Sequence, residues 1–162
     1  MTKKTRLVQE LPGKDIVNED EACVCFNLRK AARVVTHIYD EVMRPLGYRG
    51  TQITLMGVIS RYQPIAVKNL AGMIDTDPTT LLRNLRLLEK NKLIEMNQDQ
   101  NDGRVQVVTL SKKGADVLRQ AYPIWKKTQD LIAAKVGRNR LNKILRDLQE
   151  ALEAISPAPE IK

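Results

Sequence analysis

Residues 75–93, DTDPTTLLRNLRLLEKNKL, carry side chains that can hydrogen-bond to the bases of a nucleic acid duplex. Four leucines recur at helical spacing and are expected to form the buried face: Leu81, Leu82, Leu85 and Leu88. The polar residues left on the other faces are Thr79, Thr80, Arg83, Asn84 and Arg86. Arginine can pair with guanine and asparagine with adenine, and threonine can meet a phosphate, a base or the thymine methyl group. An ordinary solvated helix face would show the same pattern. We favour a base-reading helix because a hairpin follows it and the chain as a whole is basic.

Arg104 lies in a second stretch with suitable chemistry, the turn NDGRV of residues 101–105. A guanidinium at the tip of a hairpin can enter a narrow minor groove, where the negative potential is strongest. Asp102 would oppose a phosphate backbone, so we expect it to hold Arg104 through a charge-assisted hydrogen bond. The alternative is a surface turn without a function. The residues expected to contact phosphates are Lys68, Asn69, Lys112 and Lys113.

Two cysteines, Cys23 and Cys25, begin another helical pattern. A structural zinc site needs four ligands and His37 is the only histidine, so we expect no metal site. Near a helix N-terminus the unpaired N–H groups stabilise a thiolate, which would make Cys25 reactive. Cysteine also packs as a small apolar side chain, so a structural role remains open. The two residues point roughly 200° apart around a helix and cannot form a disulfide bond unless the helix unwinds.

Composition points to a polyanionic partner. The chain has 162 residues, enough for one domain, with 27 Lys and Arg against 19 Asp and Glu and a formal net charge of +8. A merely basic, soluble surface is the alternative. Aromatic residues make up 4% of the chain, too few for a platform that stacks single-stranded bases, so duplex DNA is favoured. No apolar run could span a bilayer or serve as a signal peptide, so we expect a cytoplasmic protein without a membrane partner. We also expect no cofactor.

The elements that position these residues follow from the hydrophobic periodicity. We expect a flexible arm over 1–19, a long helix over 20–47, a DNA-binding region over 48–112 and two helices over 113–156. Thr51, Asp77 and Ser111 are the expected N-caps. Two helices joined by the turn 75–77 form a helix-turn-helix, and LIEMNQ and RVQVVTL around DQNDG form a β-hairpin. The fold class is therefore mainly α with a small β-hairpin, a winged helix-turn-helix flanked by N- and C-terminal dimerisation helices.

The stretches LAGMIDTDPTTLLRNLRLLEKNKLI and DGRVQVVTLSKKG resemble the MarR family of bacterial winged-helix regulators. The family's wing signature is present as Asp102, Arg104, Leu110, Ser111 and Gly114. One departure is the lysine at position 92, where the family usually has glycine, and we expect the neighbouring asparagine at position 91 to supply the left-handed turn. The resemblance implies a homodimer that binds a pseudo-palindromic operator as a repressor and is released by an effector.

The segment VCFNLRKAAR is similar to the first helix of the branch of this family that senses organic hydroperoxides. That similarity places Cys25 at the reactive cysteine and Tyr39 at one of the tyrosines around it, with Cys23 as a candidate resolving thiol. Arg29 and Gly50 stand where two other tyrosines are expected. The effector would therefore act by cysteine oxidation or be a small aromatic ligand.

Two other classes of function compete with a DNA-binding regulator. One is a winged-helix module that contacts proteins without binding specific DNA. The other is a thiol-dependent enzyme, which would need a base beside its nucleophile. Because the chain has one histidine, distant from both cysteines in sequence, we expect no enzyme.

Overall fold

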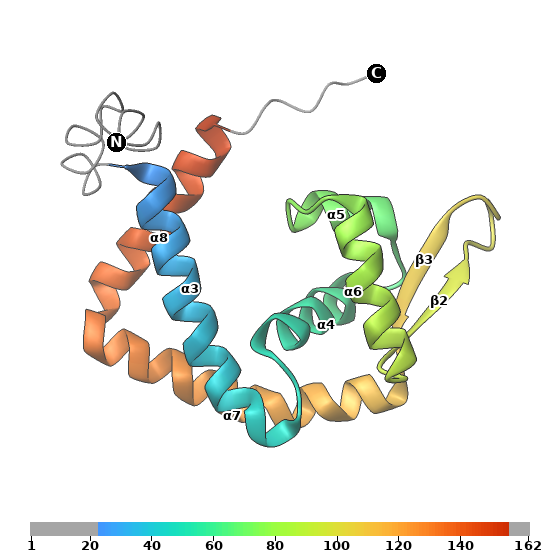
Figure 1. Cartoon of the computed structure of the whole chain (residues 1–162), viewed down its shortest axis with the longest axis horizontal. Coiled ribbons are helices and arrows are strands. Elements are labelled where there is room, and N and C mark those ends of the chain that lie inside the picture. Colours follow the sequence, from blue (N-terminus) through green and yellow to red (C-terminus); the bar gives the residue numbers. More distant parts are fainter. Residues whose placement is uncertain (1–22, 156–162) are drawn as a thin grey trace, which may run out of the picture.

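Residues 23–155 are described by a computed structural model, and they are mostly helical (Figure 1). The helices are α3 (Val24–Met43), the short 3-10 helix η1 (Arg44–Leu46), α4 (Gly50–Tyr62), α5 (Val67–Met73), α6 (Pro78–Lys90), α7 (Lys112–Val136) and α8 (Arg138–Ile155). The strands are β1 (Ile65–Ala66), β2 (Ile94–Gln98) and β3 (Gln106–Leu110). The predicted arm, 1–19, and the start of the predicted first helix lie outside the described residues.

The predicted first helix is divided in two. Regular α-helix runs from Val24 to Met43, and the next three residues form η1, with Pro45 near its start. Gly47 then ends the segment with a φ of 76°, a conformation that glycine adopts at little cost. The chain therefore turns sharply before α4.

The core lies where α4 meets the helix-turn-helix and the hairpin. Met56 and Ile59 of α4 are fully buried, as expected from a helix that is apolar nearly all round. Leu70 of α5 and Leu81 and Leu85 of α6 are equally inaccessible. The two helices of the predicted helix-turn-helix are thus held by one shared apolar core.

The hairpin is part of a three-stranded antiparallel sheet with the strand order β1-β3-β2. Val108 in the central strand pairs with Ile65 on one side and Met96 on the other, and it is fully buried. The predicted hairpin is confirmed, and β1 was not predicted because two residues are too few to show a strand period. The fold class, a winged helix-turn-helix that is mainly α, is confirmed.

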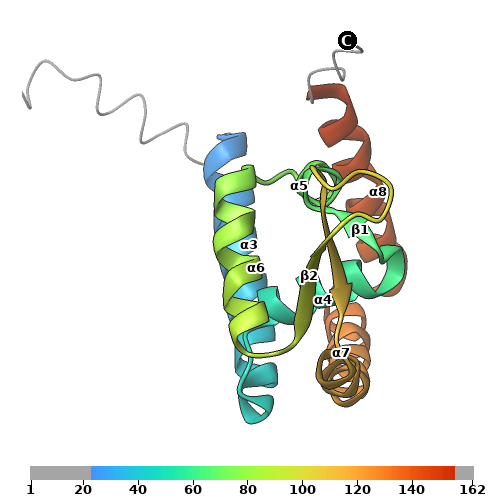
Figure 2. The same ribbon diagram turned by 90° about the vertical axis from the view of Figure 1, so that its right-hand side faces the viewer.

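Helix α7 connects this winged region to α8 (Figure 1). It packs against α3 and α4, while α8 packs chiefly against α7 and buries none of its own residues. Figure 1 draws α8 beside α3, but the view turned by 90° in Figure 2 separates the two helices. No helix within 23–155 is long and apolar enough to cross a lipid bilayer.

The N-cap of α4 differs from the prediction. The helix begins one residue before Thr51, at Gly50, and Arg49 is its N-cap. The backbone N–H of Arg49 donates to Gln52 Oε1 at 2.9 Å, and the Gly50 N–H donates to Asp40 Oδ1 at 2.7 Å. The acceptors at this helix start therefore come from Gln52 and from α3, whereas sequence reasoning expected a local threonine.

Candidate nucleic-acid interface and effector pocket

The start of α6 is fixed by Asp77. Its carboxylate accepts hydrogen bonds from the backbone N–H groups of Thr79 and Thr80, at 2.6 and 3.1 Å, and Pro78 occupies the first helical position. The predicted cap is confirmed. It orients the first turn of the helix and satisfies N–H groups that have no partner within the helix.

All five predicted base-reading residues are exposed on α6: Thr79, Thr80, Arg83, Asn84 and Arg86. Leu81, Leu85 and Leu88 are buried on the opposite side. Within the described part of the chain, neither arginine forms an ion pair. The buried leucines therefore fix the helix on the core, and its hydrogen-bonding side chains point away from the core.

Leu87 belongs to the same exposed surface, with 49% of its side chain accessible. The sequence pattern assigns the other four leucines of this helix to the buried face and does not include Leu87 among the base-reading residues. Helical spacing could have identified it, since Leu87 follows Arg83 by four residues and lies on the same side of the helix. An exposed leucine between polar groups can contact a thymine methyl or a sugar.

The predicted ion pair between Asp102 and Arg104 is not formed within residues 23–155. Instead, Asp102 Oδ1 accepts the backbone N–H of Arg104 at 3.0 Å. Asp99 Oδ1 accepts the N–H groups of Asn101 and Asp102 at 2.8 and 3.1 Å. Aspartate side chains commonly close turns in this way. The two carboxylates thus shape the backbone of the wing tip and leave the Arg104 side chain exposed.

The predicted phosphate-contacting residues divide into two groups. Lys68, Asn69 and Lys112 are exposed near helix starts. Lys113 instead donates from Nζ to the carbonyl oxygen of Asn91 at 2.9 Å, so it ties the start of α7 to the end of α6.

The two cysteines are free and exposed. Cys23 is the N-cap of α3, and its sulfur accepts the backbone N–H of Phe26 at 3.5 Å, whereas Cys25 lies within the first helical turn. Tyr39 follows Cys25 by 14 residues on the same helix, which places them about 21 Å apart along its axis. One chain therefore does not bring the three redox candidates together.

Tyr39 lines a pocket of 460 Å³ between α3, α4 and α7. Residues from all three helices face it, among them Val35, Gly50, Thr54, Trp125 and Gln129. Burial raises the pKa of the Tyr39 phenol above its ordinary value. A volume of this size, with mostly apolar walls and a few polar groups, suits a small organic molecule.

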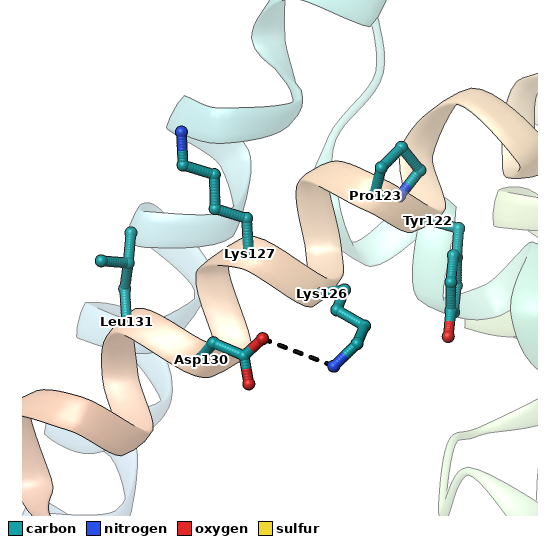
Figure 3. Close-up of a pocket in the computed structure, with 6 residues that line it drawn as sticks. All are labelled: Tyr122, Pro123, Lys126, Lys127, Asp130 and Leu131. Carbon is teal, nitrogen blue, oxygen red and sulfur yellow. Dashed lines mark hydrogen bonds and ion pairs between the residues drawn. The ribbon is translucent and has the colours of Figure 1, made fainter.

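A further hollow of 550 Å³ is formed by the surface of α7 alone (Figure 3). Tyr122, Pro123 and Leu131 line it together with an ion pair between Lys126 Nζ and Asp130 Oδ2 at 3.4 Å. Because a single helix provides its walls, it encloses a ligand less well than the pocket between three helices. Among the residues described, no cluster of three metal-ligating side chains occurs.

Comparisons with known proteins agree with this geometry. No model of a protein family matches the sequence. The transcriptional regulator MosR of M. tuberculosis, solved in complex with DNA, is 32% identical over 83% of this chain and 99% of its own, with a TM-score of 0.72. This chain belongs to the MarR family of transcriptional regulators.

Two further relatives are more distant. The S. aureus MepR–DNA complex shares the fold at 16% identity, covering 82% of this chain and 98% of that one with a TM-score of 0.73. The curated relative YxaD of Bacillus subtilis, an HTH-type transcriptional regulator, is 35% identical over 65 residues. That match spans 40% of this chain and 46% of YxaD, less than half of either protein. These relatives are transcriptional regulators, which are not enzymes.

Within the MarR family pattern, position 92 is the notable departure. Lys92 itself adopts the left-handed conformation with a φ of 59°, whereas Asn91 has a φ of −82°. The expectation that Asn91 supplies this turn is therefore wrong. The backbone is held by hydrogen bonds, since the Lys92 carbonyl accepts the Ser111 hydroxyl at 2.7 Å. These contacts offset the steric cost of a left-handed lysine.

Proposed function

We propose that this MarR-family protein is a sequence-specific regulator that binds double-stranded DNA as a homodimer and acts as a repressor. The exposed polar face of α6, together with the exposed Arg104 at the tip of the wing, is the observation that carries the proposal. A helix can place Arg83 and Asn84 against base edges in the major groove, while the wing reaches the neighbouring minor groove. The related MosR was crystallised in complex with DNA, which supports the same partner here.

A homodimer is supported by the apolar side chains that α3 and α8 leave exposed. Those of α8 include Leu145 and Ile155, which are 56% and 70% accessible, and Val34 of α3 is 56% accessible. Exposed apolar side chains that recur along a helix mark a protein interface. A second copy packed on α3 and α8 would bury them and place two α6 helices on a pseudo-palindromic operator. A Leu145→Glu variant should therefore be monomeric in sedimentation analysis.

We also propose that an effector releases the DNA, either by oxidising Cys25 or by binding as a small aromatic molecule. The exposure of Cys25 near the start of α3 supports the first route, because an oxidant can reach it. The pocket between α3, α4 and α7 supports the second, because its walls belong to the winged region and to the helices that lead away from it. A molecule bound there would bias their relative positions.

DNA binding is tested by measuring the affinity for operator duplexes, selected from a random pool, at several salt concentrations. Each phosphate contact should contribute about 0.9 to the slope of log K against log salt. Arg83→Ala should weaken binding to the selected sequence by about tenfold or more, since a paired base contact contributes about 1–3 kcal/mol. Arg140→Ala, an exposed arginine on α8, is the matched control.

Two results would contradict this function. Failure to select any sequence, together with weak salt dependence, would favour the competing protein-interaction module. Equal affinity of the Arg83→Ala and Arg140→Ala variants for the selected duplex would remove α6 from the recognition mechanism.

A further inference from the structure

Helix α6 ends in a tight turn at Lys92. The Lys92 N–H donates to the Glu89 carbonyl at 2.7 Å, and the Leu93 N–H donates to the Leu88 carbonyl at 3.0 Å. With Lys92 in the left-handed conformation, these two hydrogen bonds form a Schellman motif. Because the motif uses carbonyls of the last helical turn and the chain then turns away, the carbonyls of residues 91–93 need partners from elsewhere.

The start of α7 supplies a donor to each of these three carbonyls. The Asn91 oxygen accepts from Lys113 Nζ at 2.9 Å, and the Lys92 oxygen accepts from the Ser111 hydroxyl at 2.7 Å. The Leu93 oxygen accepts the Ser111 N–H at 3.1 Å. Ser111 and Lys113 thus bind three consecutive carbonyls, and we call these hydrogen bonds the α6–α7 clasp.

Gly114 allows the close approach that the clasp requires. A Cβ atom there would overlap the Leu93 carbonyl oxygen, so α7 begins in direct contact with the chain that leaves α6. The Ser111 hydroxyl oxygen also accepts the Gly114 N–H at 3.0 Å. The same hydroxyl therefore caps α7 and binds the end of α6, which fixes that end of α6 relative to α7.

Lys113 is the one charged group of the clasp. Its ammonium lies at the C-terminal end of α6, where the helix dipole places partial negative charge and a cation is stabilising. Asp77 fixes the first turn of α6, and Lys113 binds the other end. The neighbouring Lys112 differs, because its side chain is exposed and has no hydrogen bond or ion pair within the described chain.

We propose that Lys113 is a positioning residue for base recognition. It acts from α7, without contacting DNA, and binds the end of α6 so that the helix keeps the tilt that places Arg83 and Asn84 against the bases. The proposal rests on the proposed function, since it requires a duplex that α6 reads. It assigns different tasks to two adjacent lysines, because Lys112 remains available for a phosphate.

The test compares Lys113→Met with Lys112→Met, because both variants remove one charge from the same helical turn. Fluorescence anisotropy of the full-length protein measures the affinity for the selected duplex and for a scrambled duplex of the same length, at several salt concentrations. Lys113→Met should reduce the ratio of these affinities by about fivefold or more, since a lost base contact costs at least that factor. Its slope of log K against log salt should equal the wild-type slope. Lys112→Met should instead keep the ratio and reduce the slope by about 0.9 for each protomer that contacts DNA.

Two further measurements separate positioning from a general loss of structure. Lys113→Arg keeps a long cationic donor and should restore the wild-type affinity ratio, because a guanidinium can also bind a carbonyl. The melting temperature of Lys113→Met should stay near that of wild type, because the hydrogen bond is exposed and contributes little to global stability. If Lys113→Met fails to fold, Lys113→Gln, whose side chain is shorter and uncharged, takes its place.

The proposal is overturned if folded Lys113→Met keeps the wild-type affinity ratio, or if its salt slope falls as far as that of Lys112→Met, which would indicate a phosphate contact. It is also overturned if Lys113→Arg loses as much of the ratio as Lys113→Met. These results would leave the proposed regulator standing, since wild type would still prefer the selected duplex. A wild-type protein without that preference would contradict the regulator itself, and the positioning role with it.

Discussion

The Asp102 carboxylate accepts the backbone N–H of Arg104, with Oδ1 3.0 Å from the nitrogen, and within the described chain it forms no ion pair with the guanidinium. The carbonyl oxygen of the same aspartate accepts the N–H of Val105 at 2.9 Å. Asp102 therefore organises the turn through its oxygen atoms, and its negative charge is incidental to that role. Arg104 projects from a backbone whose shape is already set before DNA arrives.

This relationship predicts different outcomes for two substitutions of one residue. Asp102→Asn keeps an oxygen that accepts the Arg104 N–H and removes a charge that repels phosphates, so duplex affinity should stay equal or increase severalfold. Asp102→Ala removes the acceptor, loosens the turn and should weaken binding. Fluorescence anisotropy at matched salt measures both. If Asp102→Asn weakens binding relative to wild type as much as Asp102→Ala does, the charge itself is needed.

Gly114 predicts a large effect on stability. A Cβ atom there would overlap the carbonyl oxygen of Leu93 and lie 2.8 Å from Leu110 Cδ1. Gly114 is in the first turn of α7, which packs here against the residue that precedes β2. Gly114→Ala should therefore reduce the free energy of unfolding by about 3 kcal/mol, the upper part of the range for overpacking. Chemical denaturation gives the value.

Gly57→Ala is the control for Gly114, since nothing lies within 4 Å of the added atom and the residue is inside α4. It should be neutral or stabilise by up to about 1 kcal/mol, as alanine favours a helix. If Gly114→Ala and Gly57→Ala reduce the free energy of unfolding by similar amounts, the close contact between Gly114 and Leu93 is not what makes glycine necessary there.

The sequence predicted those parts of the fold that depend on local patterns. The leucine spacing of α6, the cap at Asp77 and the hairpin around residues 99–103 each follow from periodicity or turn chemistry, and the structure contains them. The exposed face of α6 was predictable for the same reason. When three of its leucines are buried, helical geometry alone decides which side chains point outward.

Contacts between distant segments were not predictable. Asp40 meets Gly50 across two helices, Gln63 Oε1 accepts the Leu110 N–H at 2.7 Å, and Lys113 reaches the Asn91 carbonyl. No periodicity encodes these tertiary hydrogen bonds. The error at Asp102 has a different cause, because charge complementarity suggested its guanidinium partner although the nearer backbone N–H was the better-placed donor.

Asp130 predicts how stability depends on pH. Hydrogen bonds from Arg138 and then Lys126 lower the pKa of its carboxyl below the ordinary value, and the first of these joins α7 to the start of α8. Since the folded pKa is below the unfolded one, the stabilisation is present at neutral pH and is lost as the pH falls below about 4. Asp130→Asn should therefore lose less thermal stability than wild type between pH 7 and pH 3.

The control for this pH effect is Asp75→Asn, because the Asp75 carboxylate forms no ion pair in the described chain. Its melting temperature should follow the wild-type pH profile. If Asp130→Asn also follows that profile, the connection between α7 and α8 contributes nothing to acid sensitivity.

The two cysteines predict distinct phenotypes if release of DNA is oxidative. A Cys25 thiolate would displace an alcohol from a hydroperoxide and become a sulfenic acid, which condenses with a second thiol to give a disulfide and water. Cys25→Ser should then bind DNA normally but no longer release it on peroxide treatment. Cys23→Ser should keep or improve the cap on the Phe26 N–H, because serine is a preferred N-cap. A gel-shift titration with cumene hydroperoxide compares both variants with wild type, and release that persists in Cys25→Ser would assign the switch to Cys23 or to the ligand pocket.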